Sequence, residues 1–325
     1  MKEITEISFD QETIVLSSNK VQGSILPKNV NELDRDIKIK ENTIVEGAMY
    51  AHKIEIENGD VCVKGAAFAQ LEIYINSGAK GVVKFEKSIG AVESVVSHAR
   101  ECKVMLMSDV NAREVRLTNA FVGGSIFADD IVLVNCVVIG GVFANKELSL
   151  SNCVVGTFNA PSVTMDGDNA LLLPTAFSLE PINYNPATTT LSNLALADLG
   201  ALYRGVAPAA NSGKIKMNLD TDEIKSTLTE ENRQMSVRSY TVVGKVLAVD
   251  MIDWEKMQNH FLLTAASLST QLLGIYDLGL DSKGEKALLT PENIYDFFMA
   301  LMLGKISVPE IDGSFSIQEI SENLK

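Results

Sequence analysis

Apolar and polar residues alternate in short segments along the first half of the chain, and a pattern of small residues recurs with this alternation. The pattern is Gly-x-apolar-x-Ala, followed after two or three residues by apolar-x-apolar. Its copies contain the pairs Gly47 and Ala51, Gly65 and Ala69, Gly124 and Ala128, Gly140 and Ala144, and Gly156 and Ala160. The glycines at 124, 140 and 156 are 16 residues apart, and those at 47 and 65 are 18 apart.

A repeat of 16–18 residues is too short for the helix pairs of helical repeat proteins. Alternation with period two, rich in valine and isoleucine, is typical of β-strands. Such a short unit cannot bury its inward row alone, but it can do so when units stack about 4.8 Å apart. The pattern therefore predicts a parallel β-helix, with glycine and alanine at its tight corners. The alternative is a β-sandwich with chance similarities, which five copies in register disfavour.

The repeat extends beyond its complete copies. Ile37 and Ile39 precede Ile54 and Ile56 by 17 positions, which is the spacing expected for equivalent strand positions in two successive coils. We therefore predict a rod over residues 37–165. The predicted fold class is mainly β with α, a parallel β-helix followed by a mainly α-helical C-terminal region.

The segments that flank the rod differ from it in pattern. Residues 1–36 are predicted as an N-terminal segment before the rod. It includes an incomplete first coil, VQGSILP at 21–27, which keeps only part of the repeat. Within the rod, residues 76–110 lose the repeat but keep short apolar strands, so we expect coils with loop insertions there. Residues 166–235 are predicted as a linker with short helices, because proline, asparagine and threonine are frequent in their first part. Residues 236–325 are predicted as an edge strand plus a helical domain.

Three features of the C-terminal region bear on how it packs. Ser192 is a candidate N-cap for a helix that ends at Gly205. A strand pattern returns at 239–250, and the candidates to cap or associate with the stack are Val242, Val246 and Val249. Apolar residues at steps of three and four then predict two helices, whose candidate partner-facing aromatics are Trp254, Phe261, Phe297 and Phe298. The alternative is that these aromatics form an ordinary helical core.

Composition and charge narrow the class of protein. The chain has 46% hydrophobic residues, a formal net charge of −14 and a pI of about 4.7. It is therefore folded rather than disordered, and it has no basic patch that would attract nucleic acid. The N-terminus lacks the pattern of a secretory signal, and no apolar run is long enough for a membrane span. Four cysteines without CxxC spacing predict a cytoplasmic protein with reduced thiols.

Chemistry-bearing motifs are sparse in this sequence. It has no Gly-x-Ser-x-Gly elbow, phosphate-binding loop, HExxH or dinucleotide-binding fingerprint. The pairs Asn135–Cys136 and Asn152–Cys153 lie 17 positions apart, which puts one above the other in a stack of coils. They are either a metal or redox pair or an asparagine ladder beside small buried cysteines, and we favour the ladder. We expect no catalytic residue, no metal and no cofactor.

Two classes of β-helix enzyme are the third alternative. Hexapeptide-repeat acyltransferases use a histidine base, for which His52 and His98 are candidates, but their hexapeptide pattern is absent here. Carbohydrate-active lyases and hydrolases line a groove with charged residues. The adjacent Asp129 and Asp130 point opposite ways in a strand or lie in a turn, so they do not form a paired acid and base.

Three segments of the repeat resemble the bactofilins: GAMYAHKIEIENGDVCVKG at 47–65, GSIFADDIVLVNC at 124–136 and GVFANKELSLSNC at 141–153. The resemblance covers residues 37–165 and implies a right-handed β-helix. It also implies a cytosolic, polymer-forming cytoskeletal protein whose rods join end to end, without nucleotide, into filaments or sheets that position other proteins. Residues 166–325 depart from that family, whose rods are usually flanked by short tails.

We therefore expect a non-enzymatic structural or scaffolding protein that associates with itself through its β-helix ends, into filaments or closed oligomers. An uncovered end presents unpaired backbone groups, and repeated end-to-end contacts that do not close generate a filament. A folded C-terminal region that covers one end stops such growth. The alternative is then a capped β-helix adaptor that binds another protein through its C-terminal helices. Neither nucleic acid nor a membrane is an expected partner.

Overall fold

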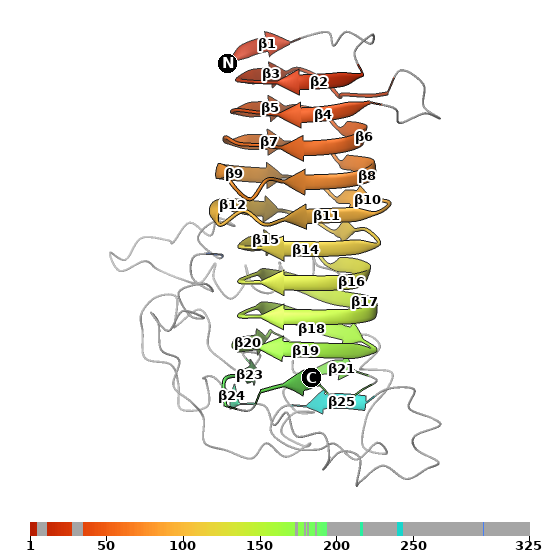
Figure 1. Cartoon of the computed structure of the whole chain (residues 1–325), viewed down its shortest axis with the longest axis vertical. Coiled ribbons are helices and arrows are strands. Elements are labelled where there is room, and N and C mark those ends of the chain that lie inside the picture. The colour runs from red at the N-terminus through yellow and green to blue at the C-terminus, as the bar shows by residue number, and fades with distance from the viewer. Residues whose placement is uncertain are drawn as a thin grey trace, which may run out of the picture. The chain divides into compact units, whose positions relative to one another are not determined.

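Parallel β-strands make up most of what the computed structural model describes. The described residues are 1–4, 12–27, 35–172, 175–178, 180, 182–185, 187–193, 215–216, 239–242 and 295. The chain divides into two compact units, Met1–Cys136 and Val137–Lys325. Both units are built from coils whose strands pair in parallel with those of the next coil (Figure 1). The predicted parallel β-helix is thereby confirmed as the fold of the described part.

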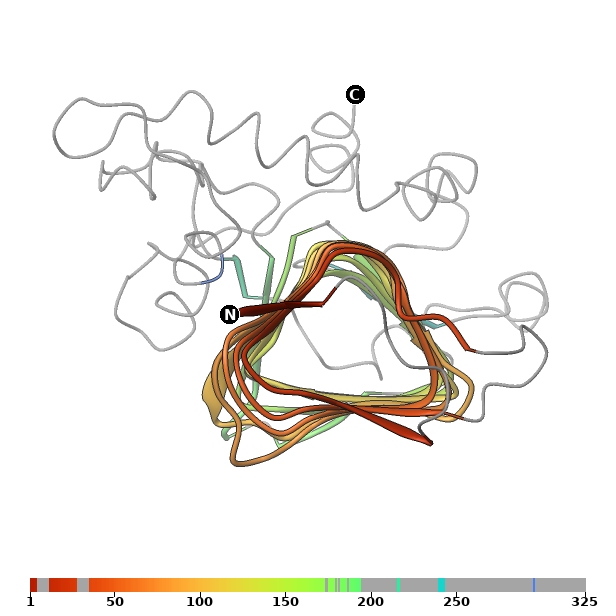
Figure 2. The same cartoon turned by 90° about the horizontal axis from the view of Figure 1, so that it is seen from above.

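Each coil of the first unit contributes to three parallel sheets, which we call faces 1, 2 and 3. Seen from above, these coils overlie one another as a three-sided outline, coloured red to yellow in Figure 2. Face 1 contains β2 (Thr13–Leu16), β4 (Asp36–Ile39), β11 (Ser94–Ser97) and β14 (Glu114–Thr118). Face 2 contains β1 (Lys2–Ile4), β3 (Asn19–Val21), β5 (Thr43–Val45), β7 (Val61–Val63), β9 (Lys80–Phe85), β12 (Glu101–Leu106) and β15 (Ala120–Val122).

Face 3 begins at Ile25, which bridges to Met49, and continues through β10 (Ile89–Ala91) and β13 (Val110–Asn111). Three longer strands start on face 3 and end on face 1, namely β6 (Met49–Ile56), β8 (Ala67–Ile75) and β16 (Ile126–Val134). Their pairing changes register near the middle, for example between Ala51 and Lys53. The chain therefore passes this corner without leaving strand conformation.

Stacked apolar side chains form the core of the first unit. Ile37 pairs with Ile54 and Ile39 with Ile56, so the rung predicted 17 positions apart is confirmed. The Ile54 column continues in register through Ile73, Val95, Val115 and Ile131, and every member is buried. Each buried side chain of this size stabilises the fold by roughly 1.5–3 kcal/mol. Together, the stacked columns form a hydrophobic core that a single coil is too small to form.

Glycine occupies a corner because successive coils approach each other closely there. A Cβ added to Gly65 would lie 2.4 Å from the backbone of Gly47 and Ala48 in the preceding coil. Gly124 has the same surroundings, at 2.4 Å from the backbone of Ser108. These corner glycines do not have positive φ, so the constraint is space rather than backbone conformation. The alanines of the repeat that lie in the first unit are buried, namely Ala51, Ala69 and Ala128.

The coils continue through the irregular segment and start earlier than the repeat suggests. Between Ile73 and Val95, which are paired neighbours, the chain takes 22 residues and includes a turn at 77–78. Extra residues at corners therefore break the sequence register at 76–110 while the strands stay paired. The first coil also includes β2, upstream of the segment 21–27 that predicted it.

The second unit has the same parallel pairing. Its parallel strands are β17 (Val137–Ser151), β18 (Val154–Ala160), β19 (Ser162–Asp166), β20 (Asp168–Leu171), β21 (Thr175–Ser178), β22 (Asn183–Tyr184) and β23 (Thr190–Asn193). Gly156 again has no room for a Cβ, which would lie 2.4 Å from the carbonyl oxygen of Gly140. Ala144 and Ala160 are buried here as their counterparts are in the first unit.

The strands of the second unit extend past the predicted end of the rod. Where the sequence predicts a linker from residue 166, the structure has β20 to β23 in parallel register with earlier strands. Ser192, the candidate helix N-cap, lies in β23 instead. Backbone pairing with the preceding coil outweighs the turn-rich composition of this segment. The helix expected up to Gly205 otherwise lies outside the described residues.

Candidate assembly surfaces

β2 lies at the N-terminal edge of face 1 in the first unit. It pairs with β4 on one side, and among the described residues no strand pairs with its other side. The carbonyl oxygen of Glu12 accepts a hydrogen bond from the N–H of Asp36 at 3.0 Å, and that of Leu16 accepts one from the residue after β4 at 2.9 Å. Alternate residues of a parallel strand bond to the same neighbour. Thr13 and Val15 therefore direct their backbone groups toward the open side.

The side chains at this edge differ between the inner and outer surfaces. Ile14 and Leu16 point inward and are only 3% and 1% exposed, so the apolar core is closed at this end. Val15 and Leu26, in the same coil, are 49% and 48% exposed. The edge therefore offers backbone groups flanked by exposed apolar side chains, rather than an open core.

Gly23 marks the same edge at the corner between faces 2 and 3. Its carbonyl oxygen accepts a hydrogen bond from the N–H of Gly47, as that of Gly47 does from Gly65, so the three are equivalent corner glycines. A Cβ on Gly47 would lie 2.4 Å from the Ser24 hydroxyl in the preceding coil, whereas a Cβ on Gly23 would meet nothing within 4 Å. The space that a preceding coil would fill is open at Gly23.

The C-terminal edge of the second unit has a different environment. β25 (Ser239–Val242) pairs antiparallel with β21, with Val242 opposite Thr175. β24 (Ile215–Lys216) pairs antiparallel with β23, with Lys216 opposite Ser192. Antiparallel strands reverse the chain direction, so they end a stack of parallel coils. Of the candidate capping residues, Val242 lies in β25, while Val246 and Val249 are outside the described residues.

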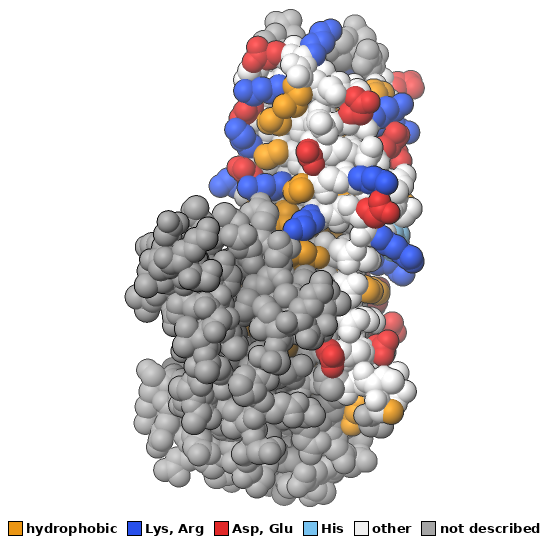
Figure 3. Space-filling view, turned by 90° about the vertical axis from the view of Figure 1, so that its left-hand side faces the viewer, with side chains coloured by type: hydrophobic (Ala, Val, Ile, Leu, Met, Phe, Trp, Pro, Cys, Tyr) orange, Lys and Arg blue, Asp and Glu red, His pale blue; other side chains and the backbone are white. Residues whose placement is uncertain are grey.

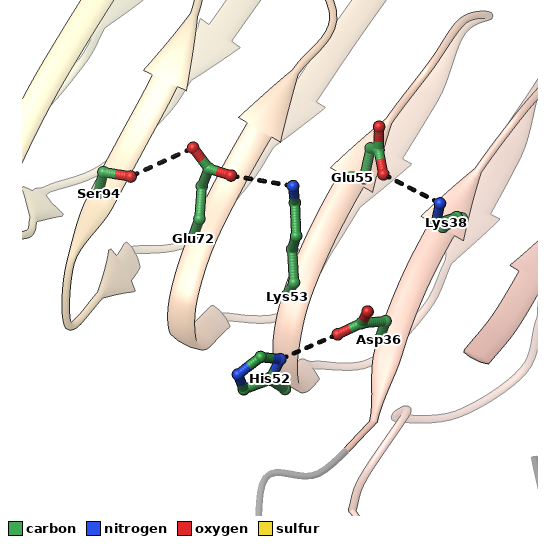
Figure 4. A network of polar contacts seen from close by, with 7 residues as sticks. All are labelled: Asp36, Lys38, His52, Lys53, Glu55, Glu72 and Ser94. Atoms are coloured by element: carbon green, nitrogen blue, oxygen red, sulfur yellow. Dashed lines mark hydrogen bonds and ion pairs between the residues drawn. The ribbon is translucent and has the colours of Figure 1, made fainter. Parts of the chain in front are cut away.

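Ion pairs cross from coil to coil on the outer surface of face 1 (Figure 4). Lys38 in β4 pairs with Glu55 in β6 at 3.4 Å, and Lys53 pairs with Glu72 in β8 at 3.1 Å. Glu72 also accepts a hydrogen bond from the Ser94 hydroxyl at 3.3 Å. Each of these partly exposed ion pairs contributes little to stability. Together they pair opposite charges on neighbouring coils, so the charged side chains are spread along the face and do not gather at one site.

His52, a candidate base in the enzyme alternative, belongs to the same network of polar contacts on face 1. Its Nδ1 lies 3.1 Å from the Asp36 carboxylate of the preceding coil, at the corner that leads into face 1 (Figure 4). Asp129 and Asp130 are neighbours in β16, whereas His52 lies in β6, which belongs to an earlier coil.

A second charge ladder runs along face 2. The Glu46 carboxylate lies 2.6 Å from the ammonium group of Lys64 and 3.4 Å from that of Lys20, so one acid joins three successive coils. The Lys64 hydrogen bond is the main cause that lowers the pKa of Glu46, and Lys20 lowers it further. The face shown in Figure 3 carries basic and acidic side chains interspersed with apolar ones over its described part. Such a mixed surface favours solubility over lateral stacking.

All four cysteines carry free thiols rather than disulfides. Cys102, Cys136 and Cys153 are buried, and burial raises the pKa of Cys102. Burial, together with the nearby charge of Glu86, also raises the pKa of the partly exposed Cys62. Within the described ranges, no group of three or more histidine, cysteine, aspartate or glutamate side chains is suited to hold a metal ion.

An asparagine ladder occurs at one corner of the first unit. Asn119 and Asn135 both adopt left-handed backbone conformations, with φ of 53° and 52°, which asparagine tolerates better than most residues. The side-chain amide of Asn135 donates to the side-chain oxygen of Asn119 at 3.2 Å, and Cys136 beside it is buried. Asn152, in the second unit, has the same conformation and accepts from the N–H of Asp168. Stacking of the 135–136 pair on the 152–153 pair stays a prediction.

The predicted partner face is not among the residues that the structure describes. Trp254, Phe261, Phe297 and Phe298 all lie outside them, and of that region only Tyr295 is described, as helical and buried. Among the described residues, no helix has the length and apolar character needed to cross a membrane. The sequence predicts association through a β-helix end but does not identify β2 as an edge strand, because nothing in a strand's own residues says that it is the last of a stack.

Comparisons with protein families, with curated proteins and with solved structures give no match to this chain. The fold defines the class of protein as a parallel β-solenoid.

Proposed function

We propose that this chain is a non-enzymatic structural protein that associates with further copies of itself through the edges of its β-solenoid. The observation that carries the proposal is the open side of β2, where Thr13 and Val15 have backbone groups directed away from β4. An unpaired strand edge is a ready template for another strand. The resemblance of residues 37–165 to bactofilins, which implies end-to-end assembly, supports the same function.

The polar networks on the outer surface also favour association through edges. On faces 1 and 2 the lysines and glutamates of successive coils already pair with each other, for example Lys38 with Glu55 and Lys64 with Glu46. Docking another molecule on these faces would require desolvation of these charges, which is costly. Backbone edges carry no such penalty, because their hydrogen bonds to water are replaced by hydrogen bonds to another strand.

A second candidate function is that of a capped β-solenoid adaptor, which binds a different protein through its C-terminal helices. The antiparallel pairing of β25 with β21 and of β24 with β23 favours it, because these strands occupy the outer sides of two strands at the C-terminal edge of the second unit. A solenoid that is closed at one end is limited in how far it can polymerise. In that case the main role of the coils is to hold the C-terminal region in place.

The experiment that tests self-association is light scattering on the purified full-length chain over a concentration series, with negative-stain electron microscopy of the same samples. Oligomers or filaments that form without added nucleotide, and whose mass rises with concentration, would support the proposal. A single monomeric mass at every concentration would overturn it and leave the adaptor as the better explanation.

A further inference from the structure

The open side of β2 has the hydrogen-bonding pattern that a second copy of β2 requires. The N–H and C=O groups of Thr13 and Val15 point to this side, while those of the residue between them point to β4. In an antiparallel pair, two residues opposite each other exchange both of their hydrogen bonds. If two β2 strands pair about a two-fold axis at Ile14, Thr13 of one copy faces Val15 of the other. All four available groups on each strand are then used.

The side chains of this edge are compatible with that register. Thr13 and Val15, both β-branched, would face each other across the outer surface, a combination that suits paired strands. Glu12 would face Leu16 of the other copy, so the pairing places no like charges opposite each other. Val15 and Leu26, which are 49% and 48% exposed, lie in the coil that would be covered.

Two further observations favour a second copy over a continuing row of copies. The corner at Gly23 has nothing within 4 Å of an added Cβ, so a neighbouring backbone has room there. At the other edge, on the second unit, β24 and β25 pair with β23 and β21, whereas β22 pairs only with β19 among the described strands. A copy that added head to tail would therefore meet antiparallel strands over β21 and β23, whereas pairing of one edge with the same edge of a second copy closes after two chains.

We infer that the chain forms a closed, two-fold symmetric dimer through antiparallel pairing of β2 with β2 of a second copy, in the register Thr13 opposite Val15. This inference rests on the proposed self-association and specifies its edge, its symmetry and its end point. The edge at β2 of the first unit is the interface, and its pairing with the same edge of a second copy ends growth after two chains.

The sharpest variant is Val15→Pro. Proline removes the N–H of residue 15, which points away from β4, so the pairing of β2 within its own chain keeps its hydrogen bonds. In the dimer, two of the four intermolecular hydrogen bonds are lost and the ring crowds the opposite strand, so we expect the dissociation constant to rise about 100-fold. Sedimentation equilibrium of wild type and variant over one concentration series measures this change, and circular dichroism checks that the strands remain.

A matched pair of charge variants separates the edge from surface hydrophobicity in general. Val15→Lys and Val92→Lys make the same substitution at valines that are 49% and 52% exposed. Val15 lies on the edge, whereas Val92 lies at a corner three coils further on, where its N–H donates to Ala69 at 3.1 Å. A lysine on an edge strand opposes pairing. We expect Val15→Lys to weaken the dimer and Val92→Lys to leave it unchanged.

Disulfide trapping tests the register. In a Cys62→Ser background, a mixture of Thr13→Cys and Val15→Cys chains is expected to cross-link into covalent dimers, because the two positions face each other. Each variant alone is expected not to cross-link, since equal positions in this register are offset by two residues and lie beyond the roughly 7 Å between Cα atoms that a disulfide can span.

The outcomes separate this inference from the function on which it rests. A wild-type dimer that Val15→Pro dissociates and that cross-links only as the mixture supports the inference. A dimer that is indifferent to Val15→Pro, or filaments in place of a dimer, overturns the inference and leaves self-association standing. A monomer at every concentration overturns the proposed function and the inference together.

Discussion

Replacement of Gly65 by alanine is the most direct test of how closely successive coils are stacked. Gly65 lies at the corner between β7 and β8, where its N–H donates to the carbonyl oxygen of Gly47 at 3.0 Å. A Cβ at this position would be 2.4 Å from the backbone nitrogen of Ala48 and from the carbonyl carbon of Gly47. Both are backbone atoms, so no side-chain rotation can relieve the contact.

The expected loss of stability follows from these distances. An ordinary contact of a Cβ lies at 3.4–4 Å, so the two coils must separate by about 1 Å at this corner. Forcing a methyl group into such a site typically costs about 1–3 kcal/mol, and lengthening the hydrogen bond beside it adds up to about 1 kcal/mol. Alanine also lowers the conformational entropy of the unfolded chain, which offsets the loss of stability by about 0.4–1 kcal/mol. We expect Gly65→Ala to lower the free energy of unfolding by about 2 kcal/mol.

Gly23→Ala is the matched control, because Gly23 is the equivalent corner glycine of the first coil and nothing lies within 4 Å of its added Cβ. This variant is expected to be as stable as wild type, or more stable by up to about 1 kcal/mol through its effect on the unfolded chain. Urea denaturation of the full-length chains, followed by the strand signal in circular dichroism, measures both variants. Equal midpoints for Gly65→Ala and Gly23→Ala would refute the argument that glycine is required by close approach of the coils.

Two further substitutions test the core and the surface. Ser97 is paired with Ile75 and Leu117 on the neighbouring strands, and its buried hydroxyl has no hydrogen-bond partner within the described part of the chain. Removal of this hydroxyl in Ser97→Ala should therefore raise the free energy of unfolding, measured by urea denaturation, by about 1 kcal/mol. A decrease would contradict this prediction. Lysines lower the pKa of Glu46, so its contribution to stability is present above the ordinary carboxyl pKa and is lost as the pH falls through the folded-state value. The difference in urea midpoint between wild type and Glu46→Gln should therefore shrink between pH 7 and pH 3; a constant difference would count against the ion pairs.

The part of the fold that could be predicted from the sequence is the part in which each coil repeats the last. Ile37 and Ile39 identify their partners Ile54 and Ile56 because the period of 17 residues is intact between them. The same reasoning gives no register over 76–110, where corner residues vary in number while the strands do not. Strand pairing depends on the backbone, and backbone pairing tolerates insertions that sequence periodicity does not.

The second unit shows why the end of the repeat is harder to predict. The segment 175–193 has prolines and threonines that favour turns, yet β21, β22 and β23 pair with preceding coils. Their strands have two to four residues, too few for alternation to stand out against the turn signals. The preceding coil acts as a template, which is tertiary information that local pattern lacks. Of the strand predicted at 239–250, residues 239–242 are described, and they form β25.

The candidate site was hidden from the sequence for a related reason. β2 and β4 have nearly the same pattern of inward isoleucine or leucine and outward Val15 or Lys38, so neither pattern says which strand has an open side. In the structure the two strands differ because β4 pairs with β2 on one side and β6 on the other, whereas β2 pairs with β4 alone among the described strands. One outward residue does hint at it, because β4 and β6 place charged residues on face 1 where β2 places Val15.

The strands at the N-terminal edge are short, which limits unspecific pairing with other chains. β2 has four residues and β1 has three, and short edge strands are a common protection against uncontrolled aggregation. A partner that offers only one matching strand gains few hydrogen bonds from them. A second copy of this chain offers β2 together with the coil around it, including Val15 and Leu26, in one rigid arrangement. Selectivity for the same chain therefore arises from the combination of short strand and surrounding coil, and an isolated peptide of residues 12–17 should not compete with the dimer.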